Sequence, residues 1–173
     1  MTSTAVAKTN PGPAPWKGAV AGAIAGIAAS LAMDLFQRAV SAASGDTSGS
    51  DEEPATDRAA DAVAQTATGR PLPEDAKPFG GQLVHYLLGA GLGLAYGVAA
   101  EYRPAVTTGE GALFGLGTAA VLDETAVPLV GLGAAPWDTG AGSHLYAVAS
   151  HLVFGTATEL VRATVRGSFD PQS

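Results

Sequence analysis

Carboxylate and imidazole side chains occur inside apolar stretches of this sequence, where an ionisable group is costly. Asp34 lies near the end of the first stretch and His85 lies in the second; Asp123 and Glu124 lie in the third, and His151 lies in the fourth. Ionisable groups in such surroundings usually face a polar interior and often carry protons or ions. A His beside a carboxylate also titrates near neutral pH. These five residues therefore predict a polar relay, that is, a proton or ion site.

A second set of charged residues lies toward the other ends of these stretches. Glu101 and Arg103 follow the second stretch, while Glu159 and Arg162 lie near the end of the fourth. Glu159 and Arg162 are three residues apart, which places them on one face of a helix. His85 and Glu101 would point to nearly opposite faces of one helix. We therefore expect the two acidic–basic pairs to form an inner gate that is separate from the relay.

The relay residues allow two other interpretations. Imidazole and carboxylate groups also bind divalent cations such as Zn²⁺, Mn²⁺ or Fe²⁺, and the candidate ligands are His85, Asp123, His144 and His151. The sequence contains no His-x-x-x-His or Glu-x-x-His motif, so we predict no cofactor and keep a divalent metal as an alternative. The third interpretation is a structural hydrogen-bonded network that fixes the register of the helices.

Motifs for enzymatic catalysis are missing. No Gly-x-Ser-x-Gly elbow occurs, and the glycines at positions 89, 91 and 93 lie inside an apolar stretch with no strand before it. We therefore favour a protein that is not an enzyme, with a membrane metalloenzyme as the least favoured function. The net charge of −7 leaves no basic surface for phosphates, so we expect no nucleic-acid partner.

Four apolar stretches must position the relay, and each is long enough, with its flanks, to cross a bilayer. They cover residues 17–40, 80–101, 110–131 and 143–165. A hydrocarbon core of about 30 Å needs roughly 20 residues of helix. Charged residues make up only 14% of the chain, against about 25% in ordinary soluble domains. We therefore predict an all-α, four-helix transmembrane bundle, a single domain over residues 16–166 in which the relay residues reach one layer.

Glycines recur at intervals of four within these stretches: Gly22 and Gly26; Gly89, Gly93 and Gly97; Gly111 and Gly115. A glycine inside a helix costs about 1 kcal/mol relative to alanine in water, whereas in a bilayer small residues at this spacing allow helices to approach closely. These faces are expected to pack against another helix, a second copy of the chain or a membrane partner. A non-enzymatic scaffold that associates through them is the main alternative function.

An internal repeat relates the two halves of the sequence. Residues 22–34 and 111–123 share the pattern Gly-Ala-[Ile/Leu]-x-Gly-[Ile/Leu]-x6-Asp, and residues 95–103 resemble 153–162. The alternative is coincidence in a chain rich in alanine and glycine. The repeat predicts two similar helical hairpins.

Residues 41–79 form a long polar loop that holds much of the acidic charge. Its front part is typical of disordered chain, while the segment from Pro54 to Gly69 predicts a short helix. Residues 1–15 and 167–173 are expected to be loose tails. Pro128, together with Gly131, predicts either a broken helix with a re-entrant loop or a turn that leaves the membrane.

Basic residues predict the orientation. Those on the side of the chain ends slightly outnumber those on the other side, which favours cytoplasmic termini. They are Lys8, Lys17, Arg103, Arg162 and Arg166.

Part of the sequence resembles the uncharacterised YagU-like inner-membrane family of bacteria. The resemblance covers roughly residues 80–165 and rests on three segments. They are HYLLGAGLGLAYGVAAEYRP from His85, PLVGL from Pro128, and His151-Leu-Val with Glu159 and Arg162 after it. The resemblance implies a small multi-spanning inner-membrane protein with no assigned activity.

The residues favour a proton- or ion-linked transport or homeostasis component that has the lipid bilayer as its solvent. The scaffold and a membrane metal-binding protein remain the alternatives.

Overall fold

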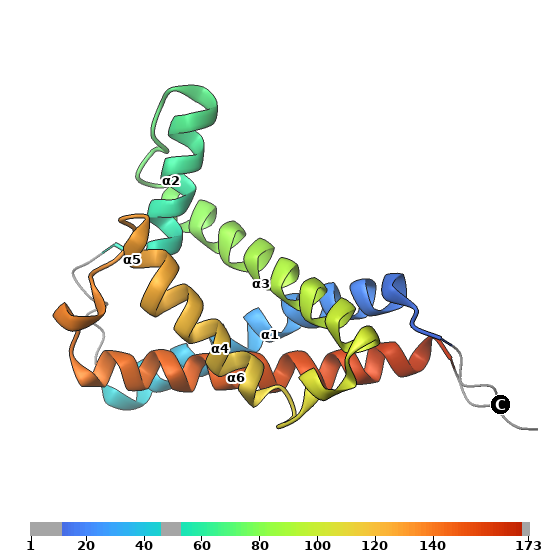
Figure 1. The fold of residues 1–173 in the computed structure, drawn as a ribbon. Coiled ribbons are helices and arrows are strands. Elements are labelled where there is room, and N and C mark those ends of the chain that lie inside the picture. Colours follow the sequence, from blue (N-terminus) through green and yellow to red (C-terminus); the bar gives the residue numbers. More distant parts are fainter. Residues whose placement is uncertain (1–11, 46–52, 171–173) are drawn as a thin grey trace, which may run out of the picture.

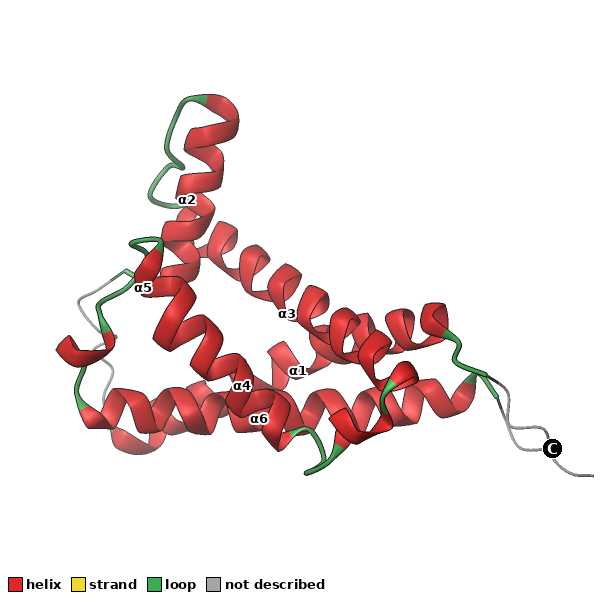
Figure 2. Ribbon diagram, viewed as in Figure 1, coloured by secondary structure: helices red, strands yellow, loops and turns green. Residues whose placement is uncertain are grey.

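The computed structural model describes residues 12–45 and 53–170. Within them, five α-helices have ten residues or more: α1 (Pro15–Ser44), α2 (Ala55–Thr68), α3 (Lys77–Tyr102), α4 (Ala112–Val121) and α6 (Ala141–Ser168). A π-helical segment, η2 (Leu122–Ala126), joins α4 to the single turn α5 (Val127–Leu129), and two 3₁₀ turns complete the structure, η1 (Pro104–Thr107) and η3 (Pro136–Asp138). Figure 2 shows that the described chain is helical apart from its connecting loops. The predicted all-α class is confirmed.

Helices α1 and α6 make most of the contacts that hold the long helices together. Helix α1 packs chiefly against α3 and α6, and α4 packs against α6. The η1 turn follows α3 and leads to α4, and α2 stands beyond the start of α3 (Figure 1). The two described ends of the chain meet, since the rings of Trp16 and Phe169 lie 5.8 Å apart between centroids.

The distribution of side chains on α1 is the reverse of that in a soluble protein. Ala21, Ala25 and Ala29 are fully buried, whereas Ile24 and Leu31 are about half exposed. Small residues thus face the neighbouring helices and large apolar residues face outward. This arrangement is favourable when the surroundings are lipid, because close packing between helices then depends on small residues.

Three helical segments are long and apolar enough to cross a membrane: Pro15–Ser44, Lys77–Tyr102 and Ala112–Leu129. Helix α6 has 28 residues but is not among them, since polar groups such as His151, Glu159 and Arg162 interrupt it. Helix α2 is a further helix inside the predicted polar loop. The predicted four-helix transmembrane bundle is therefore wrong: the described residues contain five long helices, and the three segments with the composition of spans are α1, α3 and the continuous segment α4–η2–α5.

The predicted hairpins also differ from each other. The first pair of helices, α1 and α3, has α2 inserted between them, while α4 in the second pair ends after ten residues in the π-helical segment. Their registers differ as well. In the internal repeat, Gly111 corresponds to Gly22, and Gly155 corresponds to Gly97. A Cβ atom built on Gly111 would meet the Gly155 carbonyl oxygen, whereas a Cβ atom built on Gly22 would meet the carbonyl oxygen of Gly93, four residues before Gly97. The two pairs are thus offset by about one helical turn.

Glycines bring α1 and α3 into direct backbone contact. Gly18, Gly22 and Gly26 of α1 face glycines of α3, and a Cβ atom on any of the three would lie 2.0–2.4 Å from a carbonyl oxygen of α3. These glycine faces are therefore filled within the chain. Association with a second chain through them stays a prediction.

The predicted short helix in the polar loop is confirmed. Helix α2 follows Pro54 and ends at Gly69, whose φ of 74° is the left-handed conformation that favours glycine at a helix end. Asp61 accepts a hydrogen bond from the Leu72 backbone N–H at 2.6 Å and so ties the following loop back onto α2. The predicted disorder in the front of the loop falls largely on residues 46–52, which lie outside the described residues, as do residues 1–11 and 171–173 of the tails.

Candidate functional site

A cavity of about 550 Å³ is lined by residues of α1, α3 and α6 and of the continuous segment α4, η2 and α5. Stacked and tilted rings of Tyr96, Phe114 and Phe154 join α3, α4 and α6, with centroid distances of 4.3 and 6.0 Å, and Phe154 forms part of the wall. Residues 54–57, at the start of α2, also line the cavity. Residues from all five long helices therefore line one partly open space.

Helix α3 holds the Asp34 carboxylate with three side chains. The Gln82 amide donates to Asp34 Oδ2 at 2.8 Å, the Tyr86 hydroxyl donates to the same oxygen at 3.1 Å, and His85 Nε2 lies 3.3 Å from Oδ1. Positions 82, 85 and 86 lie on one face of a helix because they are three and four residues apart. The His85–Asp34 contact is an ion pair by distance but lacks the alignment of a hydrogen bond.

The second carboxylate, Asp123, lies in the π-helical segment and faces α6. Its Oδ2 atom is 3.3 Å from His151 Nδ1, which also lies 3.0 Å from the Ala147 carbonyl oxygen. The Thr125 hydroxyl donates to the Ala120 carbonyl five residues back, the spacing of a π-helix. Pro128 follows and cannot donate an N–H to the preceding turn. Single π-helical turns of this kind occur often at functional sites.

Glu124 does not belong to this cavity. It lies 2.6 Å from His144 Nδ1, and His144 Nε2 lies 3.0 Å from the Pro136 carbonyl oxygen, so this pair fixes the η3 segment to the start of α6. Neither residue is among those that line the cavity, whereas Asp34, His85, Asp123 and His151 all are. The structure thus brings four of the five predicted relay residues to one cavity and places Glu124 outside it, because adjacent residues in a helix point in different directions.

Two hydroxyl groups on the cavity wall have no partner. Ser30 and Ser150 are fully buried, and neither Oγ atom has a hydrogen-bond partner within the described chain. Sequence reasoning missed both, as well as Gln82 and Tyr86. Ser30 lies one turn before Asp34 on the same helical face, and this spacing is the signal that would have found it.

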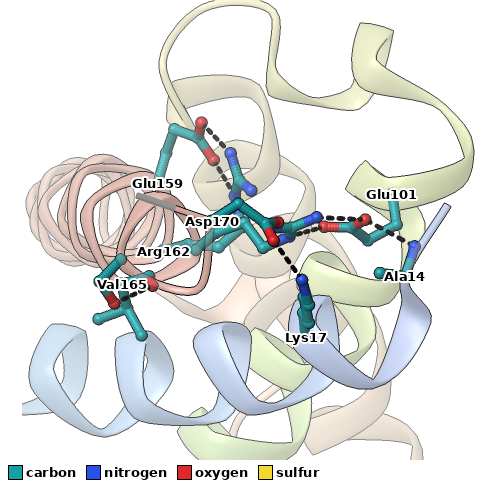
Figure 3. Close-up of polar contacts among 9 residues, drawn as sticks. Ala14, Lys17, Glu101, Glu159, Arg162, Val165 and Asp170 are labelled. Atoms are coloured by element: carbon teal, nitrogen blue, oxygen red, sulfur yellow. Dashed lines mark hydrogen bonds and ion pairs between the residues drawn. The ribbon is translucent and has the colours of Figure 1, made fainter. Parts of the chain in front are cut away.

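The other end of the molecule carries a network of charges (Figure 3). Arg166 donates to both carboxylate oxygens of Glu101, and the Ala14 backbone N–H donates to Glu101 Oε2 at 3.0 Å. Arg166 also donates to Asp170 at 2.6 Å. The predicted partner of Glu101 was Arg103, but Arg103 is exposed and takes no part in this network. Sequence spacing could not reveal Arg166, because it lies 65 residues away on α6.

The second predicted pair of the gate is present, since Arg162 donates to both carboxylate oxygens of Glu159 at 2.6 and 2.7 Å. The cavity does not include Glu101, Arg103, Glu159 or Arg162. The charged end and the cavity are thus separate sites.

Asp170 gives the charged end a pH dependence. Hydrogen bonds from Lys17 and then Arg166 lower the pKa of its carboxyl below the ordinary value. The contribution of Asp170 to stability is therefore complete above about pH 4, the pKa of an unfolded carboxyl, and is lost as the pH falls through the lower folded pKa. We expect Asp170→Asn to lower the melting temperature in detergent at pH 7 by more than at pH 3. An equal loss at both pH values would contradict this assignment.

The structure does not bring the candidate metal ligands together. Among residues 12–45 and 53–170, no three His, Asp or Glu side chains lie close enough to hold a metal ion. His144 lies outside the cavity that contains His85, Asp123 and His151.

Three helices with the length and composition of spans are typical of a membrane protein. The chain belongs to the family described as "Protein of unknown function (DUF1440)", whose model matches residues 65–160, more than half of its length. The matched region contains His85, Asp123 and His151, while Asp34 lies outside it. No curated protein and no solved structure matches the chain. The prediction of an uncharacterised family is confirmed, and the YagU-like name stays a prediction.

Proposed function

We propose that this membrane protein is a proton-linked transport component, in which two Asp–His pairs bind and release protons at the wall of a shared cavity. The observation that carries the proposal is the placement of Asp34–His85 and Asp123–His151, which come from four different helical segments and line one space. Carboxylates and imidazoles in membrane interiors are typical of proton pathways.

The geometry of each pair supports proton exchange. In each pair an imidazole nitrogen lies 3.3 Å from a carboxylate oxygen, close enough for the two groups to share a proton. Gln82 and Tyr86 donate to Asp34, and Arg38 lines an adjoining depression together with Asp34. Asp57 and Tyr146 are the other titratable residues that line the cavity. Because each pair joins two different helical segments, a small movement of these segments against each other would alter the access to the pair.

We also propose an inner-membrane location with both chain ends in the cytoplasm. The start of α1 and the end of α6 lie together and carry Lys17, Arg162 and Arg166. Basic residues next to spans favour the cytoplasmic side.

Proteoliposomes that contain a pH-sensitive dye test the proposal. The purified protein should speed the response of the dye to an imposed pH gradient relative to protein-free liposomes. His85→Ala and His151→Ala should each reduce the rate to that of protein-free liposomes, because each substitution removes one titratable partner from the cavity. Asp34→Asn should act in the same way and keeps the size of the side chain.

His144→Ala is the matched control. It removes an imidazole that also contacts a carboxylate but lies outside the cavity, so the rate should stay at that of the wild type. Circular dichroism of each reconstituted variant establishes that the helices are intact. Unchanged flux in both His85→Ala and His151→Ala would show that the pairs have only a structural role.

A further inference from the structure

We infer that the cavity binds a small organic cation, an amine with an apolar body, whose ammonium group displaces a proton beside Asp34 or Asp123. This inference rests on the proposed function and names its substrate class.

The charge of the cavity is suited to a cation. Asp34, Asp57 and Asp123 contribute three carboxylates, against two imidazoles from His85 and His151. No Lys or Arg is among the described residues that line it, and Arg38 lies beyond Asp34 in the adjoining depression. Even with both imidazoles protonated, ionised carboxylates outnumber the positive charges. An anionic ligand would therefore be repelled.

The size and the walls of the cavity are suited to an organic ligand. A volume of about 550 Å³ falls within the range of roughly 300–1,000 Å³ that small-molecule sites occupy. Met33, Leu88, Leu92 and Phe154 supply apolar surface, and Tyr146 adds a second ring. An ammonium group also interacts favourably with aromatic faces.

The unpaired hydroxyl groups are an independent indication of a ligand. Ser30 and Ser150 are fully buried at the cavity wall without a partner, although buried polar groups are nearly always hydrogen-bonded. Each lies close in sequence to one of the Asp–His pairs, Ser30 one turn before Asp34 and Ser150 next to His151. An ammonium group carries N–H donors and no acceptor, so hydroxyl and carboxylate oxygens together satisfy it.

Competition for one carboxylate links the amine to the proton. An ammonium ion beside Asp34 or Asp123 competes with a protonated imidazole for the same carboxylate, so its entry favours loss of the imidazole proton, and protonation of the imidazole favours release of the amine. The two ions thus exchange without any covalent step.

Calorimetric titration of the detergent-solubilised full chain tests the inference with three probes of similar size. 2-Phenylethylammonium is the cation, 3-phenylpropionate the anion and 2-phenylethanol the neutral compound. We expect saturable binding of the cation alone, with an affinity that falls as the pH is lowered. Equal binding of the three compounds, or no binding of the cation, would overturn the inference.

Variants then place the bound cation. Asp34→Asn and Asp123→Asn should each weaken its binding by roughly tenfold or more, equivalent to about 1.4 kcal/mol. Glu124→Gln is the matched control, because it removes a carboxylate adjacent to Asp123 that does not line the cavity, and the affinity should stay unchanged. Ser30→Ala changes little volume and should weaken binding while the helical content is retained. If none of the cavity variants alters the affinity, the amine binds elsewhere and the inference is overturned.

The dye assay separates this inference from the proposed function. Proton flux that depends on His85 and His151, in a protein that binds no amine, would overturn the inference and leave the proposed function standing. Amine binding that depends on Asp34 and Asp123, in a protein without such flux, would support the cation site and overturn the proton-linked function.

Discussion

Replacing Gly93 with Ala should destabilise the folded protein by about 1–3 kcal/mol, the usual cost of an overpacked interior. A Cβ atom at this position would lie 2.2 Å from the Gly22 carbonyl oxygen and 2.8 Å from the Gly26 Cα atom. Both are backbone atoms of α1, so relief requires the two helices to separate. The sign of the change in stability is informative, because replacing glycine with alanine within a helix otherwise stabilises the helix by about 1 kcal/mol.

Gly91→Ala is the control, since it lies on the same helix with no atom within 4 Å of an added Cβ. Unfolding in mixed micelles, followed by circular dichroism, should show a loss for Gly93→Ala and no loss for Gly91→Ala. If the two variants were equally stable, α1 and α3 would not approach each other as closely as described.

The glycine spacing illustrates what the sequence could and could not predict. A period of four places Gly22 and Gly26 on one face of a helix, because side-chain positions repeat after about that interval. The period does not identify the opposite surface. That surface, the face of α3 with Gly89, Gly93 and Gly97, depends on how the whole chain folds.

The number of spans was mispredicted for a related reason. A stretch such as 143–165 has the length of a span, but His151, Glu159 and Arg162 make it more polar than α1 or α3. In the structure His151 lines the cavity and Arg162 pairs with Glu159, while Leu145 and Leu160 are exposed. Length and average composition do not record which side of the helix each residue occupies.

The candidate site was only partly predictable. Asp34, His85, Asp123 and His151 stand out in the sequence as ionisable groups in apolar stretches, and all four line one cavity. The position of Glu124 depends on the π-helical turn, which no sequence pattern predicted. Ser30 and Ser150 carry no charge and are common residues in packed helices, so only their burial without a partner draws attention to them.

Replacing Glu101 with Gln should destabilise the protein by about 1.5–3 kcal/mol, the usual contribution of hydrogen bonds to a charged group, because Arg166 keeps Asp170 as its other acidic partner. The Glu101 side chain is only 9% exposed. It accepts two hydrogen bonds from Arg166 and one from the Ala14 N–H, and it thereby joins the end of α3 to the start of α1 and the end of α6. A glutamine amide retains one acceptor oxygen, and its NH₂ group would face the guanidinium donors.

The control for this substitution is Glu74→Gln, which removes the same charge from a side chain that is 88% exposed and paired with Lys77. Exposed pairs contribute at most about 1 kcal/mol, so this variant should unfold almost as the wild type does. A double-mutant cycle then identifies the cause. If the loss in Glu101→Gln arises from the lost contact between Arg166 and Glu101, Arg166→Met should cost less stability in the Glu101→Gln background than in the wild type. If the two losses simply add, Glu101 and Arg166 do not interact in solution, and another group must hold the three helix ends together.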